Sequence, residues 1–323
     1  MKLIIQIPCY NEADSLPVTL KELPRQVEGF DRVEWLIIDD GSIDKTVQIA
    51  RELGVDHIIS HHTNQGLAKA FMTGLNACIS AGADVIVNTD ADNQYYAGDI
   101  PSLVSPILQK KAEIVIGARP IQTIEHFSPI KKSLQRIGSW AVAMASNTRI
   151  PDAPSGFRAY TRSAAMRMVV FNDYTYTLET IIQAGQNNMA IDSVPVRVNK
   201  DLRESRLVKS IPAYIQKGIF TIVRIFAIYR PFSFFGIIGG ILFLVGFLIG
   251  CRFLYFYFIG NGEGHIQSLI LVAILLVMGF HTILVAFLAD ILSANRKLLE
   301  EIRYQQKLNN SHNKESDNGR SRI

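Results

Sequence analysis

Short apolar runs alternate with amphipathic stretches along the first 200 residues of the chain. Residues 3–7, 35–38 and 85–87 are apolar runs with the length of buried strands, and polar, turn-forming residues follow each of them. Between these runs, apolar side chains recur at helical spacing, as in residues 16–23. This alternation is typical of βαβ units, so the sequence predicts an α/β fold with a mainly parallel sheet. The same pattern predicts further strands at residues 57–60 and 113–117 and helices over residues 67–80 and 99–110.

Two much longer apolar spans follow residue 230. Residues 232–259 contain Arg252 as their only charged residue, and residues 266–289 contain no Asp, Glu, Lys or Arg. Each span exceeds the roughly 20 residues that a helix needs to cross a bilayer core, so we expect two transmembrane helices within residues 231–291. Lysine and arginine gather before the first span and after the second, which by the positive-inside rule places both termini in the cytoplasm.

These spans divide the chain into four predicted parts. Residues 1–210 are expected to form a cytoplasmic α/β domain, and residues 211–230 mix Ile, Phe and Tyr with basic residues, as expected of an amphipathic helix at the membrane interface. The two spans follow, and residues 292–323 are expected to be a basic, disordered cytoplasmic tail. The apolar run after Lys2 is too short for a signal peptide, so we expect a multi-pass protein of the cell (inner) membrane.

Composition narrows the range of partners. The net charge is only +4, and much of the basic excess lies beside the membrane spans, so nucleic acid is not implied as a partner. The three cysteines are widely spaced, which argues against a disulfide framework or a zinc site. The glycines of the first span permit close helix contact, which is consistent with a homo-oligomer.

The most chemically informative segment follows the apolar run at residues 85–87. Asp90 and Asp92 stand one residue apart at the expected carboxyl end of a strand, and the carboxamide of Gln94 is two residues further on. Carboxylate and amide oxygens are hard ligands that suit Mg²⁺ or Mn²⁺, and these ions keep coordination positions open for a substrate's phosphates. The sequence therefore predicts a metal and diphosphate site here.

Acidic residues also follow the first two strands. Glu12, Asp39 and Asp40 have oxygens that accept hydrogen bonds from ribose hydroxyls or from base N–H groups. The glycine-rich phosphate loops of other nucleotide-binding folds are missing from the sequence. Acidic groups together with a metal fit a nucleotide-sugar donor.

Four segments in order along the chain carry a resemblance to a known family. Residues 8–12 (PCYNE), 39–46 (DDGSIDKT) and 90–94 (DADNQ) resemble the successive signatures of family 2 glycosyltransferases with the GT-A fold. Within that family, residues 152–160 (DAPSGFRAY) and the two apolar spans are most similar to the polyprenyl-phosphate hexosyltransferases, the group that includes dolichol-phosphate mannose synthase.

The resemblance implies a role for particular residues of this chain. The donor, a UDP- or GDP-linked sugar, would be bound by residues of the first three motifs, and a divalent metal by the last of these. Arg119 would lie near the donor or acceptor phosphate, and a basic segment would hold the phosphate of the polyprenyl acceptor. The implied set is donor-binding Pro8, Tyr10, Glu12, Asp39, Asp40 and Asp90; metal-binding Asp90, Asp92 and Gln94; catalytic Asp152 and Arg119; and acceptor-binding Lys200, Arg203 and Arg206.

Two questions about mechanism stay open at this level. The family implies inversion at the anomeric carbon, and Asp152 would act as a general base if the acceptor is a hydroxyl group. A lipid phosphate is already ionised at neutral pH, and in that case Asp152 would orient other groups.

The lead prediction is metal-dependent transfer of a sugar to a polyprenyl phosphate at the cytoplasmic membrane face. The alternatives are a membrane-anchored transferase with a non-lipid acceptor in cell-surface polysaccharide synthesis and a non-catalytic sugar-nucleotide sensor.

Overall fold

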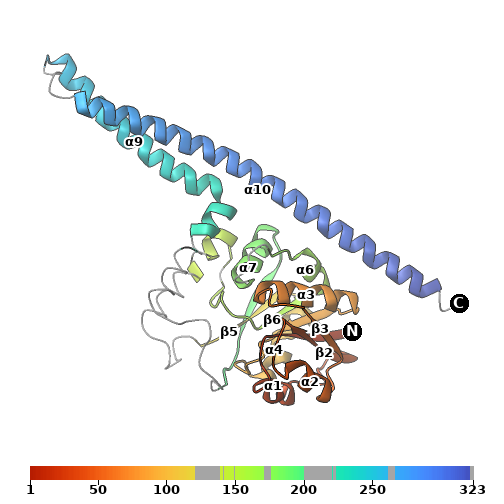
Figure 1. Cartoon of the computed structure of the whole chain (residues 1–323). Coiled ribbons are helices and arrows are strands. Elements are labelled where there is room, and N and C mark those ends of the chain that lie inside the picture. The colour runs from red at the N-terminus through yellow and green to blue at the C-terminus, as the bar shows by residue number, and fades with distance from the viewer. Residues whose placement is uncertain are drawn as a thin grey trace. The chain divides into compact units, whose positions relative to one another are not determined.

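A mixed sheet lies at the centre of the N-terminal part of the chain (Figure 1). The computed structural model describes residues 1–120, 139–140, 142–148, 150–170, 176–199, 220, 223–260 and 266–320. Within these residues the sheet has seven strands in the order β3-β2-β1-β4-β6-β5-β7. The strands are β1 (Lys2–Cys9), β2 (Arg32–Asp39), β3 (His57–Ser60), β4 (Val85–Asn88), β5 (Ile114–Ala118), β6 (Arg158–Thr161) and β7 (Ile191–Pro195).

All but one of these strands run in the same direction. β3, β2, β1 and β4 pair in parallel, and β5 pairs in parallel with β7. β6 lies between β4 and β5 and is antiparallel to both. The predicted α/β fold with a mainly parallel sheet is therefore confirmed, while the sequence analysis did not identify the reversed strand β6.

Helices cover both faces of the sheet, with α1, α2 and α4 on one side and α3, α6 and α7 on the other (Figure 1). The helices predicted at residues 67–80 and 99–110 are present as α3 and α4. The bounds are α1 (Leu16–Glu22), α2 (Thr46–Glu52), α3 (Leu67–Ser80), α4 (Ile100–Leu108), α6 (Arg162–Arg167) and α7 (Thr177–Gln186), with a short 3₁₀ helix at Ala97–Asp99.

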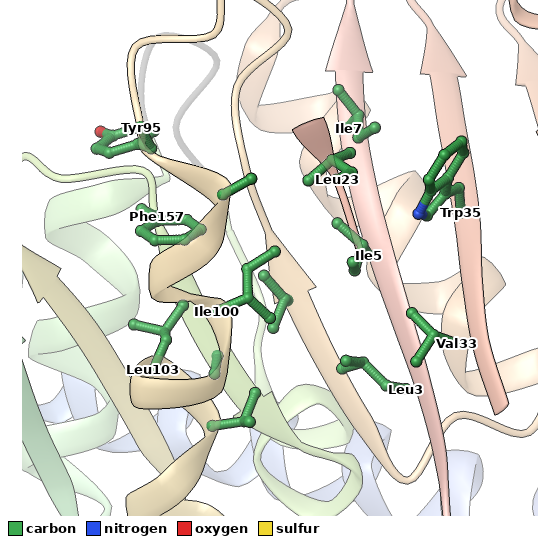
Figure 2. Packing of buried hydrophobic residues seen from close by; sticks show 14 of the residues in the cluster. Leu3, Ile5, Ile7, Leu23, Val33, Trp35, Tyr95, Ile100, Leu103 and Phe157 are labelled. Carbon is green, nitrogen blue, oxygen red and sulfur yellow. The ribbon is translucent and has the colours of Figure 1, made fainter. Parts of the chain in front are cut away.

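Alternate residues of β1 point to the two faces of the sheet, as a strand requires. Leu3, Ile5 and Ile7 are completely buried in a cluster that includes residues of β2 and α4 (Figure 2). Burial of each such side chain contributes roughly 2 kcal/mol relative to an exposed position. On the opposite face, a β-carbon at Gly74 of α3 would lie 2.5 Å from the Gln6 side chain, so this glycine lets α3 approach the sheet closely.

The apolar spans form two long helices, α9 (Pro231–Phe258) and α10 (Ile266–Arg320). Their apolar stretches have mean hydropathies of 2.5 and 2.7, and both helices are long enough to cross a membrane. Glycines allow the two helices to pack closely, because a β-carbon at Gly239 would lie 2.9 Å from the Gly279 carbonyl oxygen. Residues Ile219–Leu299 form one unit of the structure and Met1–Gly218 with Glu300–Ile323 form the other.

The structure differs from the sequence prediction at the C-terminal end, where α10 continues to Arg320 in place of a disordered tail from residue 292. The segment has no proline and no glycine between Gly279 and Gly319, so nothing in it breaks a helix. A side-chain hydrogen bond one turn apart, from Gln305 to Glu301 at 2.8 Å, adds local support. Of the predicted interfacial helix at 211–230, the structure describes only residues 220 and 223–230, and residues 223–229 are helical.

Candidate active site

The carboxyl ends of β1, β2 and β4 meet at one edge of the sheet. Cys9 pairs with Asp39 in the register of β1 and β2, and Gln6 pairs with Asn88 in that of β1 and β4. The polar motifs at residues 10–12, 39–46 and 89–94 therefore gather at this edge, as the parallel topology predicts.

The residues expected at the nucleoside end lie close together in the first two of these motifs. Asp39 is buried, and its Oδ1 accepts a hydrogen bond from the Ser42 amide at 3.0 Å. Glu12 is also buried and accepts a hydrogen bond from the Ser15 hydroxyl at 2.5 Å. Pro8 is the penultimate residue of β1, and Tyr10, directly after that strand, leaves 42% of its surface exposed. The edge thus combines two fixed carboxylates with an accessible aromatic ring.

Asp40 is placed differently from its neighbour Asp39. Its carboxylate accepts hydrogen bonds from the amides of Gln65 and Gly66 at 2.9 and 2.8 Å, and His61 Nδ1 lies 2.7 Å from its Oδ1. Only 3% of Asp40 is exposed. Asp40 therefore fastens the segment after β3 to the end of β2, and these contacts occupy both of its carboxylate oxygens.

The glycine after this aspartate has a clear structural requirement. Gly41 has a φ of +75°, and a β-carbon there would lie 2.7 Å from the Thr63 carbonyl carbon. Only glycine fits that combination of left-handed backbone and close approach. Gly41 and Asp40 together hold the segment 61–66 beside the expected nucleoside site.

Asp90 and Asp92 follow β4 and lie close enough to influence each other's ionisation. Burial of Asp90, together with the negative charge of Asp92, raises the pKa of Asp90 from 3.8 to about 7. Asp92 Oδ1 accepts a hydrogen bond from the Gln94 amide at 3.1 Å, and Asn93 between them has a left-handed φ of +56°. This tight turn presents two carboxylates and a carboxamide from alternate positions of the chain, residues 90, 92 and 94.

The chemistry of this set fits a divalent cation. Two neighbouring carboxylates, one of them held in a position that disfavours its charge, gain stability when a cation binds between them. Among the described residues there is no cluster of three or more His, Cys, Asp or Glu side chains arranged for a metal. A cation at Asp90 and Asp92 would therefore complete its coordination with amide oxygen, water or phosphate oxygen, which suits Mg²⁺ or Mn²⁺.

Arg119 and Asp152 form an ion pair next to this turn. Arg119 Nε donates to Asp152 Oδ2 at 2.7 Å and Nη2 donates to Oδ1 at 3.0 Å, which is the bidentate arrangement of strong pairs. The third guanidinium nitrogen, Nη1, lies 3.4 Å from Gln94 Oε1. Burial alone would lower the pKa of Arg119, but Tyr95 and Asp152 raise it overall, so its positive charge persists. Arg119 thus links the Asp152 loop to the candidate metal turn.

A buried polar network supports these groups, and the sequence analysis did not single out its members. Asn88 Nδ2 donates to the Gly156 carbonyl at 2.8 Å and to the Tyr176 hydroxyl at 2.9 Å, and the Gly156 amide donates to the Tyr95 hydroxyl at 2.9 Å. Arg158 is completely buried and donates to the carbonyls of residues 153 and 155, both at 2.7 Å. A sequence signal did exist, because a charged residue in an otherwise apolar strand usually has several hydrogen-bond partners.

Lys200, Arg203 and Arg206, the residues predicted to bind the acceptor phosphate, lie outside the described residues. The structure does bring the other predicted site residues to one edge of the sheet: Pro8, Tyr10, Glu12, Asp39, Asp40, Asp90, Asp92, Gln94, Arg119 and Asp152.

Comparison with known proteins finds related sequences. Residues 4–169, just over half of the chain, match the family model described as Glycosyl transferase family 2. The chain is 30% identical over 213 residues to the UDP-N-acetylglucosamine–dolichyl-phosphate N-acetylglucosaminyltransferase of Methanococcus voltae, covering 59% of this chain and 83% of that protein. It is 27% identical over 218 residues to the undecaprenyl-phosphate mannosyltransferase of Micrococcus luteus, covering 64% and 88%. It is 24% identical to the polyprenol monophosphomannose synthase of Mycolicibacterium smegmatis, covering 68% and 85%.

Solved structures show the same fold. The glucosyl-3-phosphoglycerate synthase of Mycobacterium tuberculosis, crystallised with Mn²⁺, UDP and glucosyl-3-phosphoglycerate, superposes with a TM-score of 0.55 at 16% identity, covering 70% of this chain and 78% of that one. At this identity the similarity shows the fold alone.

Proposed function

The chain belongs to glycosyl transferase family 2, and from that premise we propose that it transfers a sugar from a nucleotide-sugar donor to the phosphate of a polyprenyl lipid. Three relatives support this acceptor, because their names include dolichyl phosphate, undecaprenyl phosphate and polyprenol monophosphomannose. Two helices that are long and apolar enough to cross a membrane support it as well. Such helices would keep the enzyme where a polyprenyl phosphate is found.

The observation that carries the proposal is the position of Arg119. Its guanidinium contacts both Gln94 in the candidate metal turn and Asp152 in the facing loop. A fixed, charged guanidinium between a diphosphate site and a second loop suits an anionic acceptor, because its permanent positive charge attracts phosphate.

On the donor side, we propose that Asp39, Glu12 and Tyr10 hold the nucleoside. Asp90, Asp92 and Gln94 would hold a divalent metal, which when bound would stabilise the charge that develops on the departing diphosphate. Asp40 has a positioning role in this proposal, because its oxygens already bind the segment 61–66.

On the acceptor side, Asp152 orients Arg119 in this proposal and is not a general base. It is completely buried, and both of its oxygens accept hydrogen bonds from Arg119. A lipid phosphate is already ionised at neutral pH, so the reaction needs no base to activate it. Lys200, Arg203 and Arg206 would supply further positive charge to the same phosphate.

The proposed reaction is one displacement. The bond from the anomeric carbon to the diphosphate oxygen breaks while an acceptor phosphate oxygen forms a bond to the same carbon, which inverts its configuration. Lysine and arginine are concentrated before α9 and after the apolar stretch of α10, and by the positive-inside rule this supports a reaction on the cytoplasmic side of the cell membrane.

The test is a transfer assay on the purified full chain in detergent with Mn²⁺. Radiolabelled UDP- and GDP-sugars are offered singly with undecaprenyl phosphate, and label is followed into the organic phase. Label in lipid from one donor is the expected result, and the anomeric configuration of that product by NMR tests inversion. Assays with Mg²⁺, Mn²⁺ and EDTA test the metal requirement.

A second candidate is transfer to a non-lipid acceptor, with the two helices serving only as an anchor. The fold is compatible with it, because the glucosyl-3-phosphoglycerate synthase that shares this fold was crystallised with glucosyl-3-phosphoglycerate. Donor consumption that leaves the lipid unlabelled, and that increases when a soluble acceptor is added, would favour this candidate over the lead. No donor use with any acceptor would instead favour a sugar-nucleotide sensor.

A further inference from the structure

A short segment from a distant part of the sequence lies against the candidate metal turn. Residues 196–199, here called the strap, follow β7 and lead directly into the predicted acceptor-binding segment. The strap begins with the Val196 amide donating to the Ala118 carbonyl at 3.0 Å, which fixes it to the end of β5.

The strap then pairs with the residues after the metal turn. The Tyr96 amide donates to the Arg197 carbonyl at 3.2 Å, and Tyr95 forms an isolated antiparallel bridge with Val198. Arg197 also binds Asp99, with its amide donating to Oδ2 at 2.7 Å and Nε donating to Oδ1 at 3.0 Å. The strap is therefore fixed along its length to the segment 95–99.

Asn199, the last residue of the strap, donates hydrogen bonds to the candidate metal turn itself. Its amide donates to the Gln94 carbonyl at 2.9 Å, and its Nδ2 lies 3.1 Å from the Asn93 carbonyl oxygen and 3.5 Å from that of Tyr95. One asparagine thus bonds three consecutive carbonyls of the turn.

We propose that Asn199 is a positioning residue that holds the Asp92–Gln94 turn in its metal-binding shape. Asn93 has a left-handed backbone at the centre of this turn, and its carbonyl is one of the three that Asn199 contacts. Second-layer contacts of this kind orient metal ligands, and their loss weakens metal binding about tenfold or more. This inference rests on the proposed function, in that Asp92 and Gln94 are taken to be metal ligands.

The first experiment measures Mn²⁺ binding without turnover. The full chain in detergent is titrated with MnCl₂ alone, and the signal of free Mn²⁺ is followed by electron paramagnetic resonance. Two variants remove the Nδ2 donor: Asn199→Ala, and Asn199→Asp, which keeps the shape but places a carboxylate against the turn carbonyls. The expected result is a Kd for Mn²⁺ raised about tenfold in both variants.

The chain offers a matched control. Asn199 Nδ2 also lies 3.1 Å from Oε2 of the exposed Glu22, so Glu22→Gln alters the other partner of the same amide and leaves the turn contacts in place. This control should bind Mn²⁺ like the unaltered chain. Thermal unfolding separates weaker binding from misfolding, since the Asn199→Ala protein should melt within a few degrees of the unaltered chain. Should Asn199→Asp fail to fold, Asn199→Ala alone decides the outcome.

The outcomes distinguish this inference from the function on which it rests. An unaltered chain that binds Mn²⁺, combined with folded Asn199 variants of equal affinity, would overturn the positioning role while leaving the metal site standing. An unaltered chain that binds no Mn²⁺ would overturn the metal assignment and the inference with it. Weaker binding in Glu22→Gln that matches the Asn199 variants would assign the effect to the outer contact and refute the proposal.

Discussion

Removal of the charge at Asp90 should change the pH dependence of stability in a direction that the structure fixes. Burial and the neighbouring Asp92 raise the pKa of Asp90 from 3.8 to about 7. In the unfolded chain, Asp90 loses its proton near its ordinary pKa of about 4. The favourable contribution of the protonated group to folding is therefore complete below about pH 4 and is lost as the pH rises through about 7.

The size of the effect follows from the change in proton affinity. Each tenfold change in proton affinity between the folded and unfolded states changes the free energy of unfolding by about 1.4 kcal/mol. A rise in the pKa of Asp90 from 3.8 to about 7 therefore corresponds to at most about 4 kcal/mol of stability. Asp90 keeps some contact with solvent, and screening reduces this figure, so we expect about 2 kcal/mol. The Asp90→Asn variant lacks the ionisable group, so it should not lose this stability as the pH rises.

The assay is thermal unfolding of the full chain in detergent with EDTA, followed by tryptophan fluorescence, to which the buried Trp35 of β2 contributes. At about pH 8 the metal-free Asp90→Asn protein should melt about 4–8 °C above the unaltered chain, and near pH 4 the two should coincide. With Mn²⁺ at about 100 times its Kd, the unaltered chain should gain about 2.7 kcal/mol and the order should reverse. Parallel pH profiles for the two proteins in EDTA would refute the reasoning about Asp90.

Three further predictions concern the same edge and the C-terminal end. Arg119→Lys keeps the charge but loses the paired donors to the buried Asp152, so sugar transfer should fall about 100-fold and the melting temperature should fall by a few degrees; near-normal kcat would contradict a role in phosphate recognition. Gly156→Ala would place a β-carbon 3.1 Å from both oxygens of Asp90, so Mn²⁺ binding should weaken at an overpacking cost of about 1–3 kcal/mol, and an unchanged Kd in a titration would exclude that contact. Deletion of residues 310–323 should leave transfer activity intact, because this segment is polar and poor in hydrophobic residues; loss of activity in the membrane fraction would show that it docks.

The sequence predicted much of this fold because its signals are local. The apolar runs at β1, β2 and β4 and the acidic turns after them lie within short windows, and their parallel pairing follows from the helices between them. The donor-side motifs were found for the same reason. Carboxylates directly after buried parallel strands stand at the sheet edge where ligands of α/β folds bind.

The remaining features depend on contacts between distant parts of the chain. β6 is only four residues long, and its reversed direction follows from its pairing with β4 and β5. Asp39 and Asp40 are adjacent carboxylates in the sequence, yet only the structure shows that Asp40 binds the segment 61–66. Asn199 lies more than 100 residues from the turn that it contacts, so no local pattern identifies it.

The reversed direction of β6 has a consequence for how such an enzyme diversifies. β5 ends at the edge that carries the acidic turns and β6 begins there, so the connection of residues 119–157 leaves and re-enters the sheet at the same edge. Residues can be added to or removed from this connection without shifting the register of any strand. This connection contains Arg119 and Asp152, which we propose for the acceptor side, so exchanging it between relatives would test for new acceptors while the strands stay constant.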